Sequence, residues 1–462
     1  MKYHRPRIMI AGLKGGSGKT TLSLGLLRLW SNVIPYKKGP DYIDAGWLSL
    51  AAGNSCYNLD TYLMNDQDVI TSFISHSEGF DVSLIEGNRG IFDGMDRDGT
   101  YSTASLAKLL NCPVILVVDC IKTTSTIGVI VKGINDFDKD LNIAGVVLNQ
   151  IATKRQETVI RDAVEYHSGV KVLGVLKKGR DVLLPERHMG LLSSVEHIDP
   201  QHGIDAIANI VKETVDVSAI RDIAQNAPQI ISNKLKTKVN TIDKQLRIGA
   251  LRDKAFQFYY PDNLDALRDR GAEIIEIDAI NDIEMPDIDA LYIGGGFPET
   301  NAIDIASNYK FIDSLRSSIE SGLPVYAECG GLMFLGRSII FNSNTYKMTG
   351  IFPLDFEVSH SPKAHGYTEV EVIDADNPFY PRGAILKGHE FHYSYVINSD
   401  TDNIRFAFKM KRGKGIMNGV DGAIYKNVLA TYTHVHVLGT PLWADGFIRA
   451  GLNHKIIHLK KG

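Results

Sequence analysis

The chain has 462 residues, of which 44% are hydrophobic and 23% are charged, and its formal net charge is −4. This length predicts two large domains or about three smaller ones of ordinary globular composition. The charge balance excludes a general electrostatic affinity for nucleic acid, and no apolar run is long enough to cross a membrane. Four cysteines without metal-ligand spacing fit a cytoplasmic protein.

A glycine-rich turn joins the apolar run 8–11 to a leucine-rich segment that begins at Leu22. This strand, turn and helix order is the setting of a phosphate-binding loop, whereas a turn without nucleotide would not require it. Lys19 can reach the β- and γ-phosphates, and the Thr20 hydroxyl can bind Mg²⁺. Lys14 gives the loop a resemblance to ParA/MinD-type ATPases. The predicted ATP-binding residues are Gly15, Gly16, Ser17, Gly18, Lys19, Thr20 and Thr21.

Short apolar runs alternate with helix-length segments up to about residue 176, which predicts a doubly wound parallel α/β sheet. The runs are 8–11, 82–85, 114–118, 144–148 and 172–176. We therefore predict an N-terminal phosphate-loop domain at 1–217, a polar linker at 218–246 and a second α/β domain at 247–462. The second domain becomes rich in strands from about Ile351.

Acidic residues stand where strands of the first domain end, which is where parallel sheets bind ligands. Asp41 and Asp44 follow a turn at Gly39, and Glu86 ends the run 82–85. Carboxylate oxygens suit the Mg²⁺ of a bound nucleotide, and Asp93 is free to face a substrate in the loop after Glu86. The alternative for each residue is a solvated acid in a loop.

Three other polar residues of the first domain are weaker candidates. Asn149 ends the run 144–148, where its amide can read the edge of adenine or simply cap a turn. Arg187 and His188 can bind substrate carboxylates, although such a pair usually lies on the surface.

The sharpest feature of the second half is Cys329, between a strand-like run and a helix-like segment. Ala327 and Gly331 are small, as a nucleophile elbow requires, and a helix N-terminus would favour the thiolate. The alternative is a buried, inert cysteine.

Other parts of the second half supply the residues that a cysteine nucleophile requires, namely a base and an oxyanion hole. His434 and His436 would share one face of a strand. One histidine could then activate Cys329, and the other could orient that histidine or replace the usual acid. Gly295 and Gly296 follow the run 290–293 and offer backbone N–H groups for an oxyanion hole.

With these motifs in order, the sequence resembles the cobyrinate a,c-diamide synthase family over nearly its whole length. The matching segments are 17–21, 39–44, 86–87 with 92–94, 184–188, 294–299, 327–331, 388–392 and 432–434. The resemblance implies an N-terminal ATP-dependent amidoligase domain like dethiobiotin synthetase. It also implies a C-terminal class I glutamine amidotransferase domain.

The resemblance also implies roles for matching residues. Cys329 would be the glutaminase nucleophile and His434 its base, while Asn149 would read adenine. Mg²⁺ would be held by Thr20, Asp41 and Glu86, and the substrate carboxylate would lie by Asp44 and Asp93. Most class I glutaminases have glutamate where this chain has His436, which leaves the third member of the triad open.

The expected function is ATP- and glutamine-dependent amidation of the a- and c-carboxylates of cobyrinate, a tetrapyrrole, through an acyl phosphate. A nickel-containing sirohydrochlorin is the alternative substrate, and cobyric acid synthase fits the segment 39–44 less well. A ParA/MinD-like positioning ATPase would not explain the second half of the chain. We expect small-molecule partners and neither nucleic acid nor membrane; a homodimer is one arrangement that the sequence leaves open.

Overall fold

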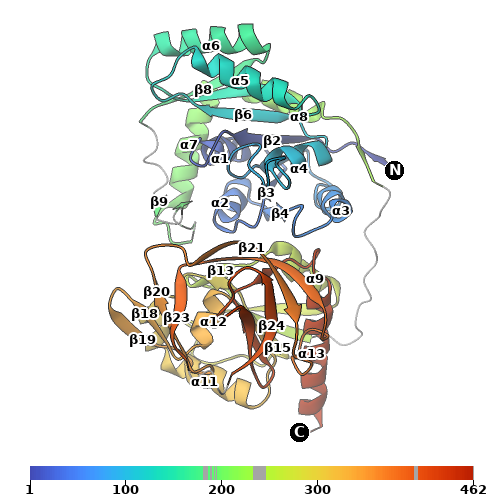
Figure 1. Cartoon of the computed structure of the whole chain (residues 1–462), viewed down its shortest axis with the longest axis vertical. Coiled ribbons are helices and arrows are strands. Elements are labelled where there is room, and N and C mark those ends of the chain that lie inside the picture. Colours follow the sequence, from blue (N-terminus) through green and yellow to red (C-terminus); the bar gives the residue numbers. More distant parts are fainter. Residues whose placement is uncertain are drawn as a thin grey trace. The chain divides into compact units, whose positions relative to one another are not determined.

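The computed structural model describes residues 1–179, 186–187, 190–191, 193, 195–232, 246–399 and 404–460. The chain divides into two compact units, Met1–Thr237 and Lys238–Gly462, which we call unit 1 and unit 2. Figure 1 shows unit 1 in blue to green and unit 2 in yellow-green to red.

Unit 1 is built on a parallel sheet of seven strands in the order β4-β3-β5-β2-β6-β7-β8 (Figure 1). The strands are β2 (Arg7–Gly12), β3 (Val33–Lys38), β4 (Tyr57–Leu59), β5 (Val82–Glu86), β6 (Val114–Asp119), β7 (Ile143–Ile151) and β8 (Val172–Lys177). All five apolar runs predicted as strands are strands here, and the predicted parallel sheet is confirmed. Since the chain passes from β5 to β6 across β2, the loop after β2 stands at the switch point of the sheet.

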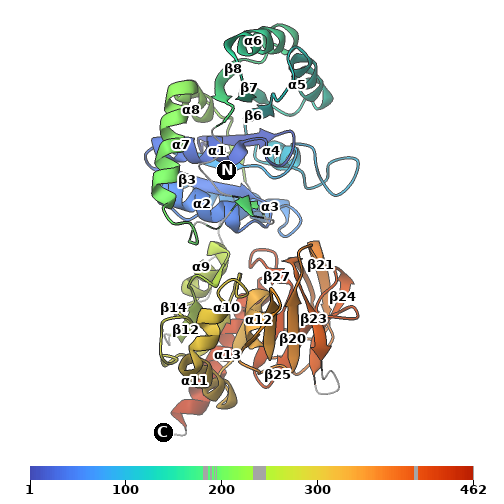
Figure 2. The ribbon, with the colours of Figure 1, turned by 90° about the vertical axis from the view of Figure 1, so that its left-hand side faces the viewer.

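Helices cover both faces of this sheet (Figure 2). They are α1 (Lys19–Leu29), α2 (Ile43–Ala52), α3 (Asp66–His76), α4 (Thr103–Leu109), α5 (Thr126–Phe137), α6 (Lys154–Ser168), α7 (Pro200–Thr214) and α8 (Val217–Gln225). Helices α1, α2, α7 and α8 share one apolar core with the strands. Proline at the first turn of α7 and its cap, in which Asp199 accepts from His202 N at 3.1 Å, fix where this helix begins.

Helix α8 lies inside the segment that we predicted to be a linker. Its residues Ile220 and Ala224 are fully buried in the core of unit 1. The spacing of four places both side chains on one face, which explains why this polar stretch folds as a helix. Two short antiparallel pairs complete the unit: β1 (Lys2–Tyr3) with β11 (Ile230–Ile231), and β9 (Glu186–Arg187) with β10 (Gly190–Leu191).

Unit 2 contains a mixed sheet of ten strands in the order β14-β12-β15-β17-β26-β25-β24-β21-β22-β27. Their bounds are β12 (Leu246–Leu251), β14 (Ala272–Ile277), β15 (Ala290–Ile293), β17 (Val325–Glu328), β21 (Ala364–Val372), β22 (Ile385–His392), β24 (Arg405–Arg412), β25 (Val420–Tyr425), β26 (Val428–Thr431) and β27 (His434–Val435). The strands from β14 to β26 pair in parallel, and the later ones pair antiparallel. The strand-rich character predicted beyond Ile351 is thus confirmed.

Two smaller sheets accompany the large one. Their strands are β13 (Phe256–Phe258), β16 (Gly295–Gly296), β18 (Ser338–Phe341), β19 (Asn344–Lys347), β20 (Leu354–Val358) and β23 (Ser394–Ser399). The helices are α9 (Pro261–Asp269), α10 (Ala302–Ser307), α11 (Tyr309–Glu320), α12 (Gly330–Leu335) and α13 (Leu442–Leu459). One core cluster holds side chains of α10, α11 and α12, and another holds those of α9 and α13.

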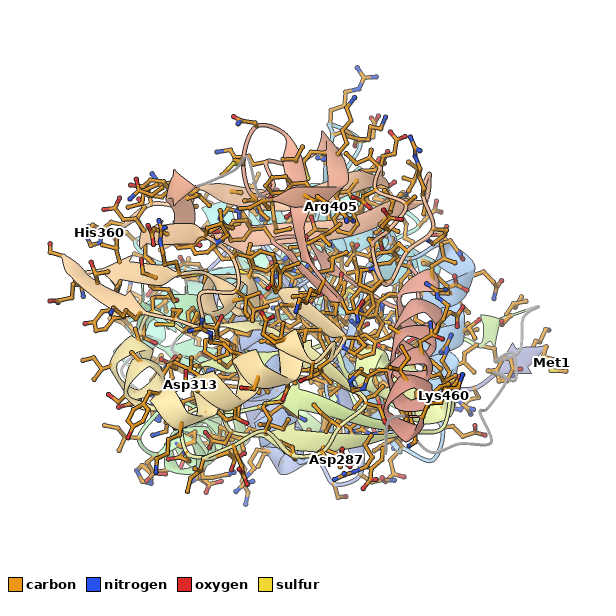
Figure 3. The ribbon with its side chains drawn as sticks, turned by 90° about the horizontal axis from the view of Figure 1, so that it is seen from below. Met1, Asp287, Asp313, His360, Arg405 and Lys460 are labelled. Carbon is orange, nitrogen blue, oxygen red and sulfur yellow. The ribbon has the colours of Figure 1, made fainter. Side chains whose placement is uncertain are left out.

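Figure 3 shows unit 2 from below, with several of its charged residues labelled. Asp287 precedes β15, Asp313 lies in α11 and Arg405 begins β24, and all three are exposed. In the described part of the chain, no helix combines the length and apolarity needed to span a membrane.

Candidate active sites

The phosphate loop of unit 1 connects β2 to α1, as predicted. Gly18 caps α1 in the left-handed conformation with φ 93°, and Gly16 also has a positive φ of 69°. A side chain at Gly12 would meet Ser17 Oγ at 2.1 Å, so the start of the loop also requires glycine. Gly15 and Gly16 are exposed, and Thr21 lies within the first turn of α1. The backbone therefore has the conformation needed to surround an anion at a helix start.

Lys19 bridges two backbone segments of this site. Its ammonium group donates to Lys14 O at 3.0 Å and to Arg89 O at 3.1 Å. Burial lowers the pKa of Lys19, and nearby Glu86 opposes that shift. The Lys14 side chain instead forms a 3.0 Å ion pair with Asp119 at the end of β6. The two loop lysines thus have different partners, and only Lys19 is buried.

A buried lysine lies among the acidic residues that we predicted to surround Mg²⁺. Lys37 Nζ is 2.5 Å from Asp44 Oδ2, 2.6 Å from Glu86 Oε1 and 3.8 Å from Asp41 Oδ2. Lys37 and Glu86 face each other in the parallel pair β3 and β5. Asn58 donates to the carbonyls of Gly39 and Asp41 and thereby fixes the turn that carries the other two acids. We call Lys37, Asp41, Asp44 and Glu86 the ion cluster.

Three members of the ion cluster have pKa values that are shifted in different directions. Burial and the neighbouring Asp44 raise the pKa of Asp41 to about 7. Burial also acts to raise the pKa of Asp44, but the Lys37 ammonium outweighs it and the pKa is lowered. Burial disfavours the Lys37 cation, yet Asp44 and Glu86 raise the pKa of Lys37 well above its usual value. The cluster therefore holds a lysine cation against a shared negative charge.

Several oxygen atoms of this site are of the kind that Mg²⁺ prefers, although the described residues contain no group of three His, Cys, Asp or Glu side chains placed to hold a metal ion. Thr20 Oγ1 donates to Glu86 Oε1 at 3.1 Å, which brings two predicted ligands together at the start of α1. Glu86 Oε2 is buried and has no hydrogen-bond partner among the described residues. A buried carboxylate oxygen without a partner is costly, and a hard cation would satisfy it. Thr20, Asp41 and Glu86 thus have suitable chemistry, and their role as ligands stays a prediction.

The remaining candidates of unit 1 have diverse surroundings. Asn149 Nδ2 donates to Ser17 O at 3.0 Å, and its amide packs against Gly18, so it supports the phosphate loop. Asp93 is exposed, and its carboxylate accepts from Gly90 N at 2.8 Å. Arg187 lies in β9, and His188 lies outside the described residues. Adenine and substrate binding by these residues stay predictions.

Cys329 of unit 2 stands at the predicted elbow between β17 and α12. Its backbone has φ 49° and ψ −98°, a conformation that a non-glycine residue rarely adopts. Its N–H donates to Thr431 O at 2.7 Å. A side chain at Gly331 would lie 2.8 Å from Ile293 O, which explains why this position is glycine. The strained turn presents the thiol at the end of the strand, as in a nucleophile elbow.

The protonation state expected for this thiol is corrected by the structure. Burial raises the pKa of Cys329, and Glu299 raises it further, whereas a backbone N–H at Gly330 acts in the opposite direction. The helix after the thiol has only six residues. Desolvation therefore outweighs the helix start, and the resting thiol requires a base.

The two predicted histidines are both buried but have different partners. His434 Nδ1 lies 3.3 Å from Glu328 Oε2, and His436 Nε2 lies 3.3 Å from Asp262 Oδ2. Strand β27 ends at Val435, so the strand that we expected to carry both rings carries only His434. The His389 ring of β22 stacks on His434 with 4.8 Å between ring centres.

A side chain of α9 holds the segment that carries these histidines. Asn263 Nδ2 donates to Val435 O at 2.9 Å, and Asn263 Oδ1 accepts from Val437 N at 2.8 Å. The amide therefore replaces a neighbouring strand at the edge of the ten-stranded sheet.

The predicted oxyanion glycines surround the elbow. A side chain at Gly295 would lie 3.4 Å from His434 Nε2, and one at Gly330 would lie 3.1 Å from Gly296 N. Gly296 has φ 155°. Gly295 thus lies against the His434 ring, and the Gly296 amide lies close to the residue after Cys329. The oxyanion role itself stays a prediction.

Comparison with known proteins decides the family. Residues 8–192 match the CobQ/CobB/MinD/ParA nucleotide binding domain, and residues 247–441 match the CobB/CobQ-like glutamine amidotransferase domain. A cobyrinate a,c-diamide synthase from Magnetococcus marinus is 38% identical over 458 residues, covering 97% of this chain and 98% of the relative. One from Archaeoglobus fulgidus is 39% identical over 455 residues, with coverage of 97% and 98%.

The chain belongs to the cobyrinate a,c-diamide synthase family.

Members of this family combine a nucleotide-binding domain with a glutamine amidotransferase domain, and the chain is accordingly a glutamine-hydrolysing ligase. Among solved structures, a glutamine amidotransferase from Thermotoga maritima matches 46% of this chain and 86% of that chain. Its sequence identity is 14% and its TM-score is 0.30, too low to identify the fold by itself.

Sequence reasoning missed two residues that the structure of this family member brings into the sites. Lys37 stands two residues before the segment 39–44, and a lysine near the end of a buried strand was the available signal. Glu328 stands directly before Cys329.

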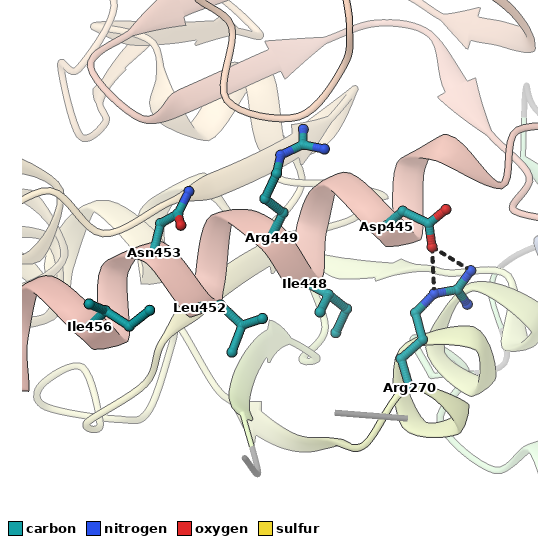
Figure 4. A pocket seen from close by; sticks show the side chains of 7 residues that line it. All are labelled: Arg270, Asp445, Ile448, Arg449, Leu452, Asn453 and Ile456. Atoms are coloured by element: carbon teal, nitrogen blue, oxygen red, sulfur yellow. Dashed lines mark hydrogen bonds and ion pairs between the residues drawn. The ribbon is translucent and has the colours of Figure 1, made fainter. Parts of the chain in front are cut away.

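Unit 2 also has a pocket that contains none of the candidate site residues. It is lined by Arg270, Asp445, Ile448, Arg449, Leu452, Asn453 and Ile456 (Figure 4).

Proposed function

We propose that the chain amidates the a- and c-carboxylates of cobyrinate, with ATP as the activating nucleotide and glutamine as the nitrogen source. The observation that carries this proposal is the presence of a phosphate loop with an ion cluster in unit 1 and a thiol elbow in unit 2. The relatives named cobyrinate a,c-diamide synthase match nearly the whole chain, so the combination is common to chain and relatives.

The first reaction releases ammonia in unit 2. The Cys329 thiol loses its proton to His434 Nε2, and the sulfur attacks the amide carbon of glutamine. Gly295 and Gly296 offer N–H groups to the resulting oxyanion. His434 then returns the proton to the leaving nitrogen, and water hydrolyses the thioester to give glutamate. The raised pKa of Cys329 is the reason that a base is required.

The second reaction activates the substrate carboxylate in unit 1. The N–H groups of the phosphate loop and Lys19 bind the phosphates of ATP. The carboxylate attacks the γ-phosphorus, ADP leaves, and ammonia displaces phosphate from the acyl phosphate to form the amide. Thr20, Asp41 and Glu86 would hold Mg²⁺, which neutralises phosphate charge when bound. Asp44 and Asp93 are the candidates for positioning the substrate, and Lys37 is a cation that a substrate carboxylate could meet.

The experiment supplies ATP, Mg²⁺ and glutamine labelled with ¹⁵N at its amide, together with either cobyrinate or nickel sirohydrochlorin. We expect two labelled amides on cobyrinate, detected by mass spectrometry, and ADP formed with them. Label on the nickel macrocycle alone would assign the other substrate. Absence of label on both macrocycles, with glutamine still hydrolysed, would overturn the proposal.

A further inference from the structure

The usual third member of a class I glutaminase triad is absent from its position in this chain, because His436 stands there. Its Nδ1 accepts from Leu438 N at 3.3 Å, and its Nε2 faces Asp262 at 3.3 Å. Both nitrogens therefore have partners other than the His434 ring. The acid that orients His434 has to come from elsewhere in the fold.

A second carboxylate lies against the base. Glu328 is fully buried, and its Oε2 lies 3.3 Å from His434 Nδ1. The same carboxylate accepts from Tyr292 Oη at 3.0 Å and from Val435 N at 3.2 Å. A buried carboxyl group requires such hydrogen-bond donors, because an unpaired polar group in the interior is costly. The donors come from β15 and β27, so the carboxylate is fixed by the sheet.

We infer that Glu328, the residue before the nucleophile, is the positioning residue that replaces the missing triad acid. This inference rests on the proposed roles of Cys329 and His434. An ionised Glu328 accepts from Nδ1–H and so selects the tautomer whose Nε2 is free to take the thiol proton. When Nε2 becomes protonated, Glu328 stabilises the imidazolium and remains a carboxylate throughout.

The surroundings of the base support this assignment. The His434 ring also lies against Gly295, where a side chain would come within 2.7 Å of Cε1 and 3.4 Å of Nε2. His389 is a second titratable group beside the base, because its ring stacks on His434. Burial and the adjacent His434 lower the pKa of His389 well below its usual value, so His389 is neutral and does not compete with Glu328 as an anion. Glu299, Glu328 and Asp421 all act to raise the pKa of the Cys329 thiol, so Glu328 lies close enough to influence both the base and the nucleophile.

Two buried acids make a matched comparison, because each lies 3.3 Å from one of the two histidines. We would measure kcat and KM for glutamine hydrolysis in Glu328→Gln, Glu328→Asp and Asp262→Asn. Ammonia-dependent synthesis would serve as the control for folding. The rate at which iodoacetamide alkylates Cys329 would be followed against pH by mass spectrometry of its peptide.

We expect Glu328→Gln to lower kcat by about 10²- to 10⁴-fold with little change in KM, since the amide no longer favours one tautomer or the imidazolium. Alkylation of Cys329 should shift to higher pH, which loss of a purely structural contact would not cause. Glu328→Asp should retain the alkylation profile better than Glu328→Gln, and Asp262→Asn should cost much less.

Wild-type kcat in Glu328→Gln, or an equal loss in Asp262→Asn, would overturn the inference. If Glu328→Gln also loses ammonia-dependent synthesis, Glu328→Asp decides: in a folded Glu328→Asp, which keeps a carboxylate, a loss of kcat with no shift of the alkylation profile would contradict the assignment. The variant Cys329→Ser distinguishes failure of the proposed glutaminase site from failure of the role assigned to Glu328. Glutamine hydrolysis that survives in Cys329→Ser refutes the proposed site, whereas an inactive Cys329→Ser beside a fully active Glu328→Gln refutes only the role of Glu328.

Discussion

The two candidate sites bury polar groups in opposite ways. The site in unit 1 buries charge: Lys37 is 1% exposed and lies within 4 Å of three carboxylates. In unit 2, burial raises the pKa of the Cys329 thiol and lowers the pKa of His389, and the Glu328 carboxyl group lies beside His434. A site for phosphates and a cation requires charges in place before the ligand arrives. A site that creates a thiolate requires the charge to form only when the base takes the proton.

The comparison predicts that the thiol can be removed without affecting unit 1. Cys329→Ser should abolish glutamine-dependent synthesis, because the hydroxyl is a much weaker nucleophile, and should leave ammonia-dependent synthesis nearly intact. Both rates can be measured with the same macrocycle and ATP. Equal loss with both nitrogen donors would show that the two activities are not separable.

The converse change removes a charge from unit 1. Glu86→Gln should reduce ammonia-dependent synthesis by orders of magnitude while glutamine hydrolysis persists, since it replaces an oxygen anion beside the nucleotide. Asp41→Asn should act in the same direction. The dependence of the remaining rate on Mg²⁺ concentration provides the check, and wild-type turnover in either variant would refute the metal assignment.

The histidines of unit 2 should differ in importance. His434→Ala should lower glutamine hydrolysis by about 10²- to 10⁴-fold, the usual effect of losing a positioned base. His436→Ala should cost less, because the His436 ring is paired with Asp262 of α9. Ammonia-dependent synthesis controls for folding in both variants. Equal losses would mean that the two rings act as one unit.

The buried charge of unit 1 should also appear in its stability. Lys37→Met leaves Glu86 and Asp44 without their cation and should lower the free energy of unfolding by about 3–5 kcal/mol. Lys14→Met removes a lysine whose side chain is 64% exposed and should change it by about 0–1 kcal/mol. Denaturant titration of the two variants measures the difference. Similar small losses would show that Lys37 does not stabilise the ion cluster.

The smallest expected effect concerns His389 of unit 2, which should make the free energy of unfolding depend on pH. The pKa of His389 is lowered in the folded protein. Below about pH 6.5 the unfolded chain therefore binds a proton at His389, whereas the folded chain does not. Stability should therefore fall as pH decreases through this range, by up to about 1.4 kcal/mol per pH unit. His389→Gln should reduce the slope of unfolding free energy against pH. An unchanged slope in this variant would contradict a neutral His389.

Local patterns predicted those parts of the molecule that depend on neighbours in the sequence. The apolar runs became strands, the glycines at 16 and 18 have the positive φ of a phosphate loop, and Cys329 occupies a strained elbow. Contacts across the sheet were not predictable. Lys37 meets Glu86 through the register of β3 and β5, and Glu328 meets His434 across β17 and β27. The protonation of Cys329 was mispredicted because burial, which the sequence does not reveal, outweighs the helix start.

The amide of Asn263 gives the segment that carries His434, the proposed base of unit 2, an anchor outside the sheet. Strand β27 has two residues and lies at the sheet edge, where local unfolding costs least. Asn263 adds two hydrogen bonds to the backbone directly after His434. Amide hydrogen exchange at Val437 would therefore report the opening of this segment. Such opening withdraws the base while the elbow of Cys329 stays folded in the sheet interior. Fraying of this two-residue strand would therefore stop proton transfer by the proposed base without unfolding the core that holds Cys329.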